Sequence, residues 1–326
     1  MAAIASRMGW ISVVVGLLVL LAGCGESDDS GQAGDQAPPQ ESATAGAGSE
    51  HQHMGGSPVA GEPGDAMQVF LVASQLVVGQ NRFAVGLTTP DNALIDDADV
   101  TFEYFDLSNP AAPVSESKAE ATRLSSTDGL TVIYAQERSF DRAGAWGVLI
   151  DATRPDGTTL SRNISFDVLA DSPTLAIGEK APAIDSPTSA DVDGDLTKLT
   201  SASKPNPAFY EMTIADALAD GKPTVVLFAT PSYCQTRFCG PDYDIVSDIQ
   251  QRYGAQFNAI HVEVYSGLPN PAASGWQYNQ PLIDFGVQTE PWLFVINAAG
   301  VVTWRVEGLF TEDEVVAALR DVGVTG

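Results

Sequence analysis

Cysteine, histidine and basic residues are all scarce in this chain. It contains three cysteines, three histidines and 16 lysines and arginines against 42 acidic residues, so its formal net charge is −26. A surface this acidic repels nucleic acid and anionic lipid headgroups, and neither is expected as a partner. The three cysteines are Cys24, Cys234 and Cys239. Their placement is the most informative feature of the sequence.

The first cysteine follows an apolar segment at the N-terminus. Arg7 precedes the apolar run from Trp10 to Leu21, which is too short for an ordinary membrane-spanning helix and typical of an export signal. Leu21-Ala22-Gly23-Cys24 resembles the lipobox of bacterial lipoproteins. That resemblance implies a signal peptide over residues 1–24, with Cys24 as the lipidated residue that anchors the protein to the bacterial cell membrane outside the cytoplasm. A plain secretory signal with a chance cysteine is the alternative. Either form of export allows a disulfide to persist.

Residues 25–65 contain almost no large apolar side chains and are rich in Gly, Ser, Ala, Pro, Gln and acid. Such a segment cannot bury enough surface to offset its ordering entropy, so it is predicted to be a disordered tether. Within it, His51, His53 and Met54 combine imidazole and thioether groups that suit copper. Two histidines in a tether more often have no function, and no cofactor is expected apart from this possible copper site.

Residues 66–170 are predicted to form an all-β sandwich. The apolar–polar alternation that is typical of strands occurs over 68–77, 82–88, 100–105, 130–138, 146–151 and 163–169. Turn sequences such as Asp128-Gly129 and Pro155-Asp156-Gly157 separate these runs. Ala143 to Val148, followed by the second of these turns, resembles the late hairpin of Ig-like modules in bacterial exported proteins. No catalytic constellation is evident here, which favours a binding or spacer module.

A linker and lead-in over residues 171–207 are followed by a domain over 208–326 in which strands and helices alternate. Helices are predicted over 213–219, 241–253, 282–285 and 312–322, and strands over 224–229, 257–264, 291–297 and 301–307. The apolar run 224–229 needs cover on both faces. Thr311 and Glu314 form a capping-box pattern at the start of the last helix.

This order, with a cysteine pair where a strand gives way to a helix, resembles the thioredoxin fold over residues 175–326. Gly178 to Pro182 is similar to the lead-in of membrane-anchored thioredoxin-like proteins, and Phe228 to Cys234 is similar to their approach to the active site. Thr289-Glu290-Pro291-Trp292 falls where that family has its cis-proline. The resemblance implies an α/β thioredoxin-like domain after the Ig-like sandwich, and a cis bond before Pro291.

The spacing of the pair departs from the family, because Cys234 and Cys239 form C-x4-C rather than C-x-x-C. Alignment from the end of the helix gives Cys234 the place of the nucleophile and Cys239 that of the resolving cysteine. In the rival alignment Cys239 is the nucleophile and Asp242 replaces the second cysteine. Five residues apart on a helix, two Cα atoms lie roughly 8.6 Å apart. A disulfide needs less than about 7 Å. A bonded pair therefore predicts a loop from residue 234 to 238 and a helix that starts near Gly240-Pro241.

The resemblance also implies roles at the site. Cys234 would attack a disulfide of a protein partner, Cys239 would resolve the mixed disulfide, and Pro291 would shape the partner groove. Arg237 and the helix N-terminus would stabilise a thiolate, whereas Glu290 would oppose this or shuttle protons. The buried acid that many thioredoxins carry in the preceding strand is missing, since Val226, Leu227 and Phe228 stand there.

Three alternatives remain open at the level of sequence. A static disulfide is one, although closing so short a ring stabilises a fold by only about 2 kcal/mol. A copper-binding or copper-delivery protein similar to Sco-type chaperones is another, with Cys234 and Cys239 as ligands, alone or together with His51, His53 and Met54. Sco-type chaperones also use a distant histidine, whereas His261 lies inside a predicted strand, where a core or edge histidine is expected. The third is a redox-inert binding protein that uses the thioredoxin-like domain as a scaffold. No Thr-x-x-Cys arrangement that would indicate a peroxidase precedes Cys234.

Overall fold

The computed structural model describes residues 67–234 and 236–325. The predicted signal peptide and tether, with Cys24, His51, His53 and Met54, lie outside the described residues. Within the described ranges, no helix is both long enough and apolar enough to cross a membrane.

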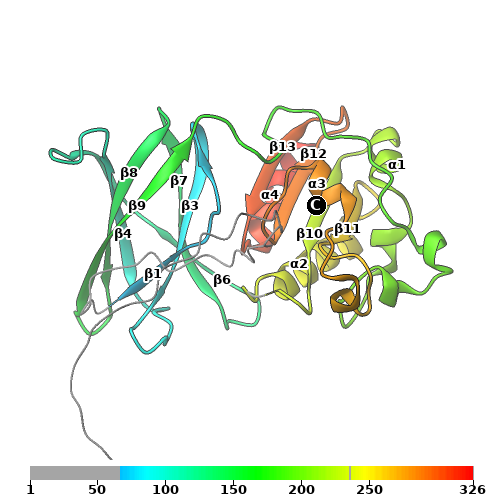
Figure 1. Ribbon diagram of the computed structural model, residues 1–326, viewed down its shortest axis with the longest axis horizontal. Helices are drawn as coiled ribbons and strands as arrows, with labels where there is room; N and C mark the ends of the chain where they lie inside the picture. The colour runs from blue at the N-terminus through cyan, green and yellow to red at the C-terminus, as the bar shows by residue number, and fades with distance from the viewer. Residues whose placement is uncertain (1–66, 235, 326) are drawn as a thin grey trace, which may run out of the picture. The chain divides into compact units, whose positions relative to one another are not determined.

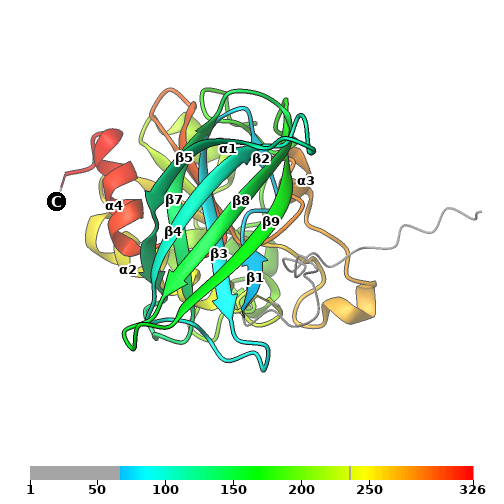
Figure 2. The ribbon, with the colours of Figure 1, turned by 90° about the vertical axis from the view of Figure 1, so that its left-hand side faces the viewer.

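Residues 68–169 form nine strands in two sheets. The strands are β1 (Gln68–Leu71), β2 (Leu76–Val77), β3 (Gly79–Thr88), β4 (Asp99–Asp106), β5 (Val114–Glu120), β6 (Thr122–Ser125), β7 (Val132–Phe140), β8 (Gly144–Thr153) and β9 (Thr159–Leu169). One sheet has the order β1-β3-β7-β6 and the other β2-β9-β8-β4-β5. All neighbours pair antiparallel except β2 and β9. Figure 2 shows β4, β8 and β9 running side by side.

The two sheets share one hydrophobic core, so this region is a β-sandwich. Alternate side chains of β3, including Phe83, meet side chains of β4 and β8 such as Phe102 and Trp146. The rings of Phe83 and Phe102 lie 5.2 Å apart in an edge-to-face arrangement, and those of Phe140 and Trp146 lie 5.0 Å apart. The core contains no cysteine.

The predicted strand pattern differs from the structure in two respects. The run 68–77 is divided between β1 and β2, and β5 and β6 were not predicted from the sequence. β5 is the edge strand of its sheet and reads Val-Ser-Glu-Ser-Lys-Ala-Glu, with nearly every side chain exposed. A strand with two solvated faces has no apolar alternation to reveal it.

Residues 189–321 contain helices around a third sheet. The elements are η1 (Ser189–Val192), η2 (Leu196–Lys198), η3 (Pro207–Tyr210), α1 (Ile214–Ala219), β10 (Thr224–Ala229), α2 (Cys239–Tyr253), β11 (Asn258–Glu263), η4 (Pro271–Ser274), α3 (Gln280–Asp284), β12 (Trp292–Ile296), β13 (Val302–Glu307) and α4 (Glu312–Asp321). The strand order is β11-β10-β12-β13. β10 pairs parallel with β11 and antiparallel with β12, which pairs antiparallel with β13 (Figure 1).

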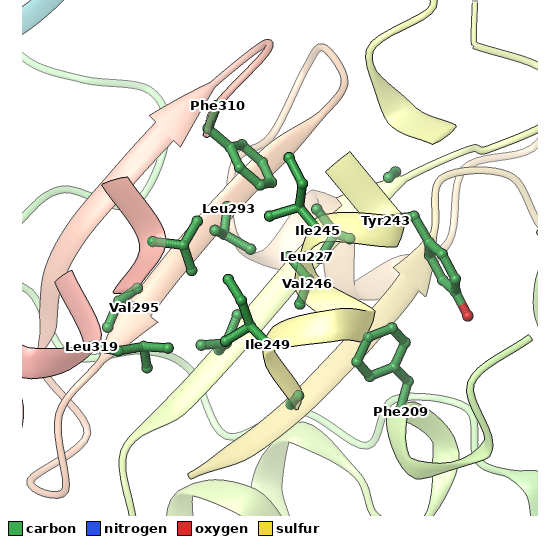
Figure 3. Packing of buried hydrophobic residues seen from close by; sticks show 14 of the residues in the cluster. Phe209, Leu227, Tyr243, Ile245, Val246, Ile249, Leu293, Val295, Phe310 and Leu319 are labelled. Atoms are coloured by element: carbon green, nitrogen blue, oxygen red, sulfur yellow. The ribbon is translucent and has the colours of Figure 1, made fainter. Parts of the chain in front are cut away.

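The central strands of this sheet are buried on both faces. On one face, Leu227, Leu293 and Val295 pack against α2 and α4, as Figure 3 shows through Ile249 and Leu319. On the other face, alternate side chains of β10 and β12 pack against α1 and the end of α3. The continuous apolar run 224–229 reflects this double cover, as the sequence predicted.

The segment predicted as a linker and lead-in is ordered against this sheet. Ile184 and Leu199 are buried in the clusters on its two faces. Gly178 N donates to Val302 O at 2.9 Å, and Ala181 N donates to Gly300 O at 2.9 Å. The lead-in therefore pairs with the turn between β12 and β13.

Candidate functional site

A disulfide joins Cys234 and Cys239 where β10 gives way to α2. The two Cα atoms lie 6.0 Å apart. Thr236 and Arg237 lie outside any helix, and Arg237 has a left-handed φ of 63°. α2 begins at Cys239, with Pro241 in its first turn. The predicted non-helical segment and helix start are thus confirmed to within one or two residues, and the sulfur of Cys239 lies at the N-terminus of a 15-residue helix.

The two cysteines differ in exposure. Cys239 is fully buried, whereas Cys234 is partly exposed. The sulfur of Cys234 lies 3.2 Å from the hydroxyl of Thr236. An external sulfur can therefore reach Cys234 and not Cys239.

The predicted cis bond between Glu290 and Pro291 is present. Pro291 directly precedes β12, and its carbonyl accepts a hydrogen bond from Gly308 N at 2.9 Å. The preceding side chain points to the disulfide, since Oε2 of Glu290 lies 3.6 Å from Sγ of Cys239. Burial raises the pKa of Glu290 to about 7, an effect that the polar groups of Thr230 only partly offset.

A second acid, Glu263, lies nearby at the end of β11 and is buried. Glu263 accepts hydrogen bonds from the backbone N–H of Ser201 at 2.9 Å and from its hydroxyl at 2.8 Å. Burial raises the pKa of Glu263 to about 8, and the neighbouring charge of Glu290 acts in the same direction. Glu263 was not predicted from the sequence as part of the site. An acid within the predicted strand 257–264, between Val262 and Val264, was the available signal.

Asp242, which the rival alignment placed in the role of the second cysteine, is fully buried in the first turn of α2. One carboxyl oxygen accepts a hydrogen bond from Phe310 N at 3.4 Å, and the other has no hydrogen-bond partner among the described residues. Burial raises the pKa of Asp242 well above its usual range. The rival alignment also needs Cys239 to be open to attack, and its burial disfavours this.

His261 is a core histidine, as expected from its place in a strand. Its Nε2 donates to the carbonyl of Ala229 at 3.0 Å, which leaves Nδ1 to accept from the hydroxyl of Tyr210 at 2.8 Å. Burial lowers the pKa of His261 to about 3. Both ring nitrogens are used within the protein, so His261 has no free nitrogen to act as the distant histidine ligand of Sco-type chaperones.

Arg237 is exposed between the two cysteines. Its predicted role in stabilising a thiolate stays a prediction. Cys234, Cys239 and Glu290 form the one cluster, within the part of the chain that the structure describes, whose ligand atoms lie close enough to hold a metal, all within 4.8 Å of one another. The sulfurs are available as ligands only after the disulfide is reduced.

No protein-family model and no curated protein sequence matches the chain. Among solved structures, it is similar to a thiol:disulfide interchange protein of the thioredoxin family from Chlorobium tepidum TLS, with 20% identity, a TM-score of 0.32, and coverage of 45% of this chain and 97% of that one. It is also similar to a copper-bound variant of FetP from uropathogenic Escherichia coli strain F11, with 10% identity, a TM-score of 0.26, and coverage of 36% and 96%. Likenesses this weak carry no argument about this chain.

The chain's own topology defines the thioredoxin-like domain. A parallel β10–α2–β11 unit is followed by an antiparallel β12–β13 hairpin and a final helix, α4. The cysteine pair lies at the start of α2, and a cis-proline directly precedes β12.

Proposed function

We propose that this protein is a thiol–disulfide oxidoreductase, anchored outside the cytoplasm through a lipidated Cys24. One observation carries the redox role: a partly exposed cysteine is bonded to a buried one at a helix N-terminus, beside a carboxyl group and a cis-proline. The positive end of the helix stabilises a thiolate, so the pair is placed for exchange.

In the reduced protein, the Cys234 thiolate attacks one sulfur of a partner disulfide. A mixed disulfide forms, and the partner's other sulfur leaves as a thiolate. Cys239 then gives its proton to the nearby carboxylate of Glu290 and attacks Sγ of Cys234. The partner's second sulfur leaves, the internal disulfide forms, and two electrons have passed to the partner. Regeneration consumes an external dithiol by the reverse exchange.

In this proposal Pro291 borders the groove for the partner, and Arg237 adds positive charge beside the pair. We also propose that the β-sandwich before the thioredoxin-like domain is Ig-like. The proposed domain limits are 66–170 for the sandwich and 208–326 for the thioredoxin-like domain.

A redox titration of the chain, read by thiol alkylation, tests the function. We expect a reduction potential above about −300 mV, together with insulin-reductase activity that is lost in Cys234→Ser. A potential below that value would identify a static disulfide. Cys239→Ser should instead accumulate mixed disulfides, because Cys234 can still attack while nothing resolves the product.

Copper binding is the second candidate, favoured by the cluster of Cys234, Cys239 and Glu290. Thiolates suit Cu(I), whereas a carboxylate is a poor third ligand for it. A Cu(I) titration of the reduced protein discriminates between the two functions. Tight binding that either cysteine-to-serine variant abolishes would support copper handling.

A further inference from the structure

The outer face of one sandwich sheet carries a buried apolar patch. On β3 and β7, Phe83 and Tyr134 point into the sandwich core, so their neighbours in the strands point outward. Those neighbours, Ala84, Ile133 and Ala135, are nevertheless 1%, 0% and 4% exposed. On the other sheet, outward residues of β9 such as Ser165 are polar and exposed. The patch of Ala84, Ile133 and Ala135 is therefore covered by another part of the chain.

The cover comes from segments next to the redox site. Leu309, just after β13, is fully buried against the patch, and Phe238, the residue before Cys239, packs beside it. Gly308 makes this approach possible. It has a φ of +73°, and a Cβ at this position would collide with Val72 of the sandwich.

Polar contacts join the same two regions. Ser74 N donates to Oε2 of Glu307 at 2.8 Å, and Thr289 donates its hydroxyl proton to Oε1 at 2.6 Å. The hydroxyls of Ser74 and Thr289 lie 3.2 Å apart. Arg82 of β3 donates to the carbonyl of Leu309 at 2.9 Å.

Both segments that touch the sulfurs therefore also touch the sandwich. Phe238 belongs to the loop that the disulfide closes, and Thr289 precedes Glu290, whose carboxyl group faces Cys239. We propose that the patch of Ala84, Ile133 and Ala135 is a docking surface for the redox loops of the same chain, and that docking and the Cys234–Cys239 disulfide stabilise each other. Opening the disulfide frees the loop that carries Phe238, and because linkage is reciprocal, docking favours the oxidised form.

The inference rests on the proposed ability of the pair to open, and it does not depend on the identity of the partner. Two glutathione thiols reduce the disulfide: the S–S bond breaks, two S–H groups form on Cys234 and Cys239, and one molecule of oxidised glutathione is released. The equilibrium constant of this reaction measures the coupling.

The test compares Ala84→Glu with Ser165→Glu, which places the same charge on an exposed position of the other sheet. The full chain is equilibrated with glutathione buffers and its dithiol fraction is measured. We expect Ala84→Glu to shift the constant toward the dithiol at least fivefold, about 20 mV for a two-electron couple. Ser165→Glu should stay within twofold of the unmodified chain. A folded Ala84→Glu chain that also stays within twofold would overturn the inference.

Hydrogen exchange of the unmodified chain gives a second measurement that needs no substitution. The Ser74 amide is bonded to Glu307 in the docked, oxidised form, so its exchange should rise severalfold when the disulfide is reduced. Unchanged exchange would contradict the coupling even if Ala84→Glu fails to fold. A disulfide that opens only in Ala84→Glu would contradict the proposed function and support the coupling. A disulfide that stays closed in both chains would contradict both.

Discussion

Glu290 illustrates how the environment of a single residue sets its chemistry. Its side chain is partly buried, lies 3.6 Å from the sulfur of Cys239 and has a pKa raised to about 7. A group with this pKa can accept the proton of the resolving cysteine and release it again near neutral pH.

We predict that Glu290→Gln slows the resolution of a mixed disulfide by roughly one hundredfold, because the amide cannot accept the proton. In the unmodified chain, the resolution rate should rise with pH through about 7, where Glu290 loses its proton, and this inflection should be absent from the variant. Stopped-flow measurement of thiol release between pH 5.5 and 9 checks both effects. A variant that retains the inflection would assign it to another group.

The raised pKa of Glu263 leads to a prediction about how the folding stability of the protein depends on pH. Its pKa is about 8 in the folded protein and near 4.5 in the unfolded chain, so the folded state retains a proton that the unfolded state loses. The associated stability is present below pH 4.5 and is lost as the pH rises through 8. Between pH 5.5 and 8.5 the oxidised protein should therefore lose at least about 1 kcal/mol more than Glu263→Gln does. Denaturant unfolding at both pH values measures this.

The exposed Glu211 provides the matched control for that measurement. Glu211→Gln should follow the unmodified chain at both pH values. If Glu263→Gln also follows it, the pH dependence comes from other buried groups.

At the scale of elements, α4 is fixed by a cap that the sequence predicted. The Thr311 hydroxyl accepts from Glu314 N, and Glu314 accepts in return from the backbone N–H of Thr311. We predict that Thr311→Ala destabilises the protein by about 1 kcal/mol, whereas Thr311→Ser, which keeps the acceptor, changes stability by only a few tenths. Thermal unfolding of the two variants checks this, and equal losses would rule out a role for the hydroxyl.

Elements with a strong local signal were predictable, and long-range contacts were not. β10 was predicted at its observed bounds because five consecutive apolar residues after Thr224 require two covered faces. The non-helical loop between the two cysteines was predictable because Cα atoms five residues apart on a helix are too far apart for a disulfide. The burial of Glu263 and Asp242 depends instead on segments distant in sequence, such as Ser201 and Phe310. Contacts between residues so far apart cannot be predicted from a single sequence.

The apolar patch on the sandwich was also unpredicted, although its signal was present. β7 begins Val-Ile-Tyr-Ala without alternation, which is typical of a strand covered on both faces. The sequence shows that such a strand needs cover. Only the fold identifies Leu309 and Phe238 as that cover.

At the scale of the whole molecule, the proposed membrane attachment depends on one residue. If Cys24 carries the lipid, Cys24→Ala should release the protein from the membrane fraction into a soluble one, because no other anchor was predicted. Cell fractionation with immunodetection measures the distribution. A variant that stays in the membrane fraction would exclude a lipid at Cys24 as its attachment.

The contact around Gly308 has a practical consequence for anyone who divides this chain into pieces. A recombinant sandwich would present Ala84, Ile133 and Ala135 to water, and a recombinant redox domain would present Leu309 and Phe238. Each fragment would expose to solvent an apolar surface that is buried in the whole chain, and such a surface favours self-association during purification. Fragments intended for crystallisation or screening should therefore keep residues 67–325 together.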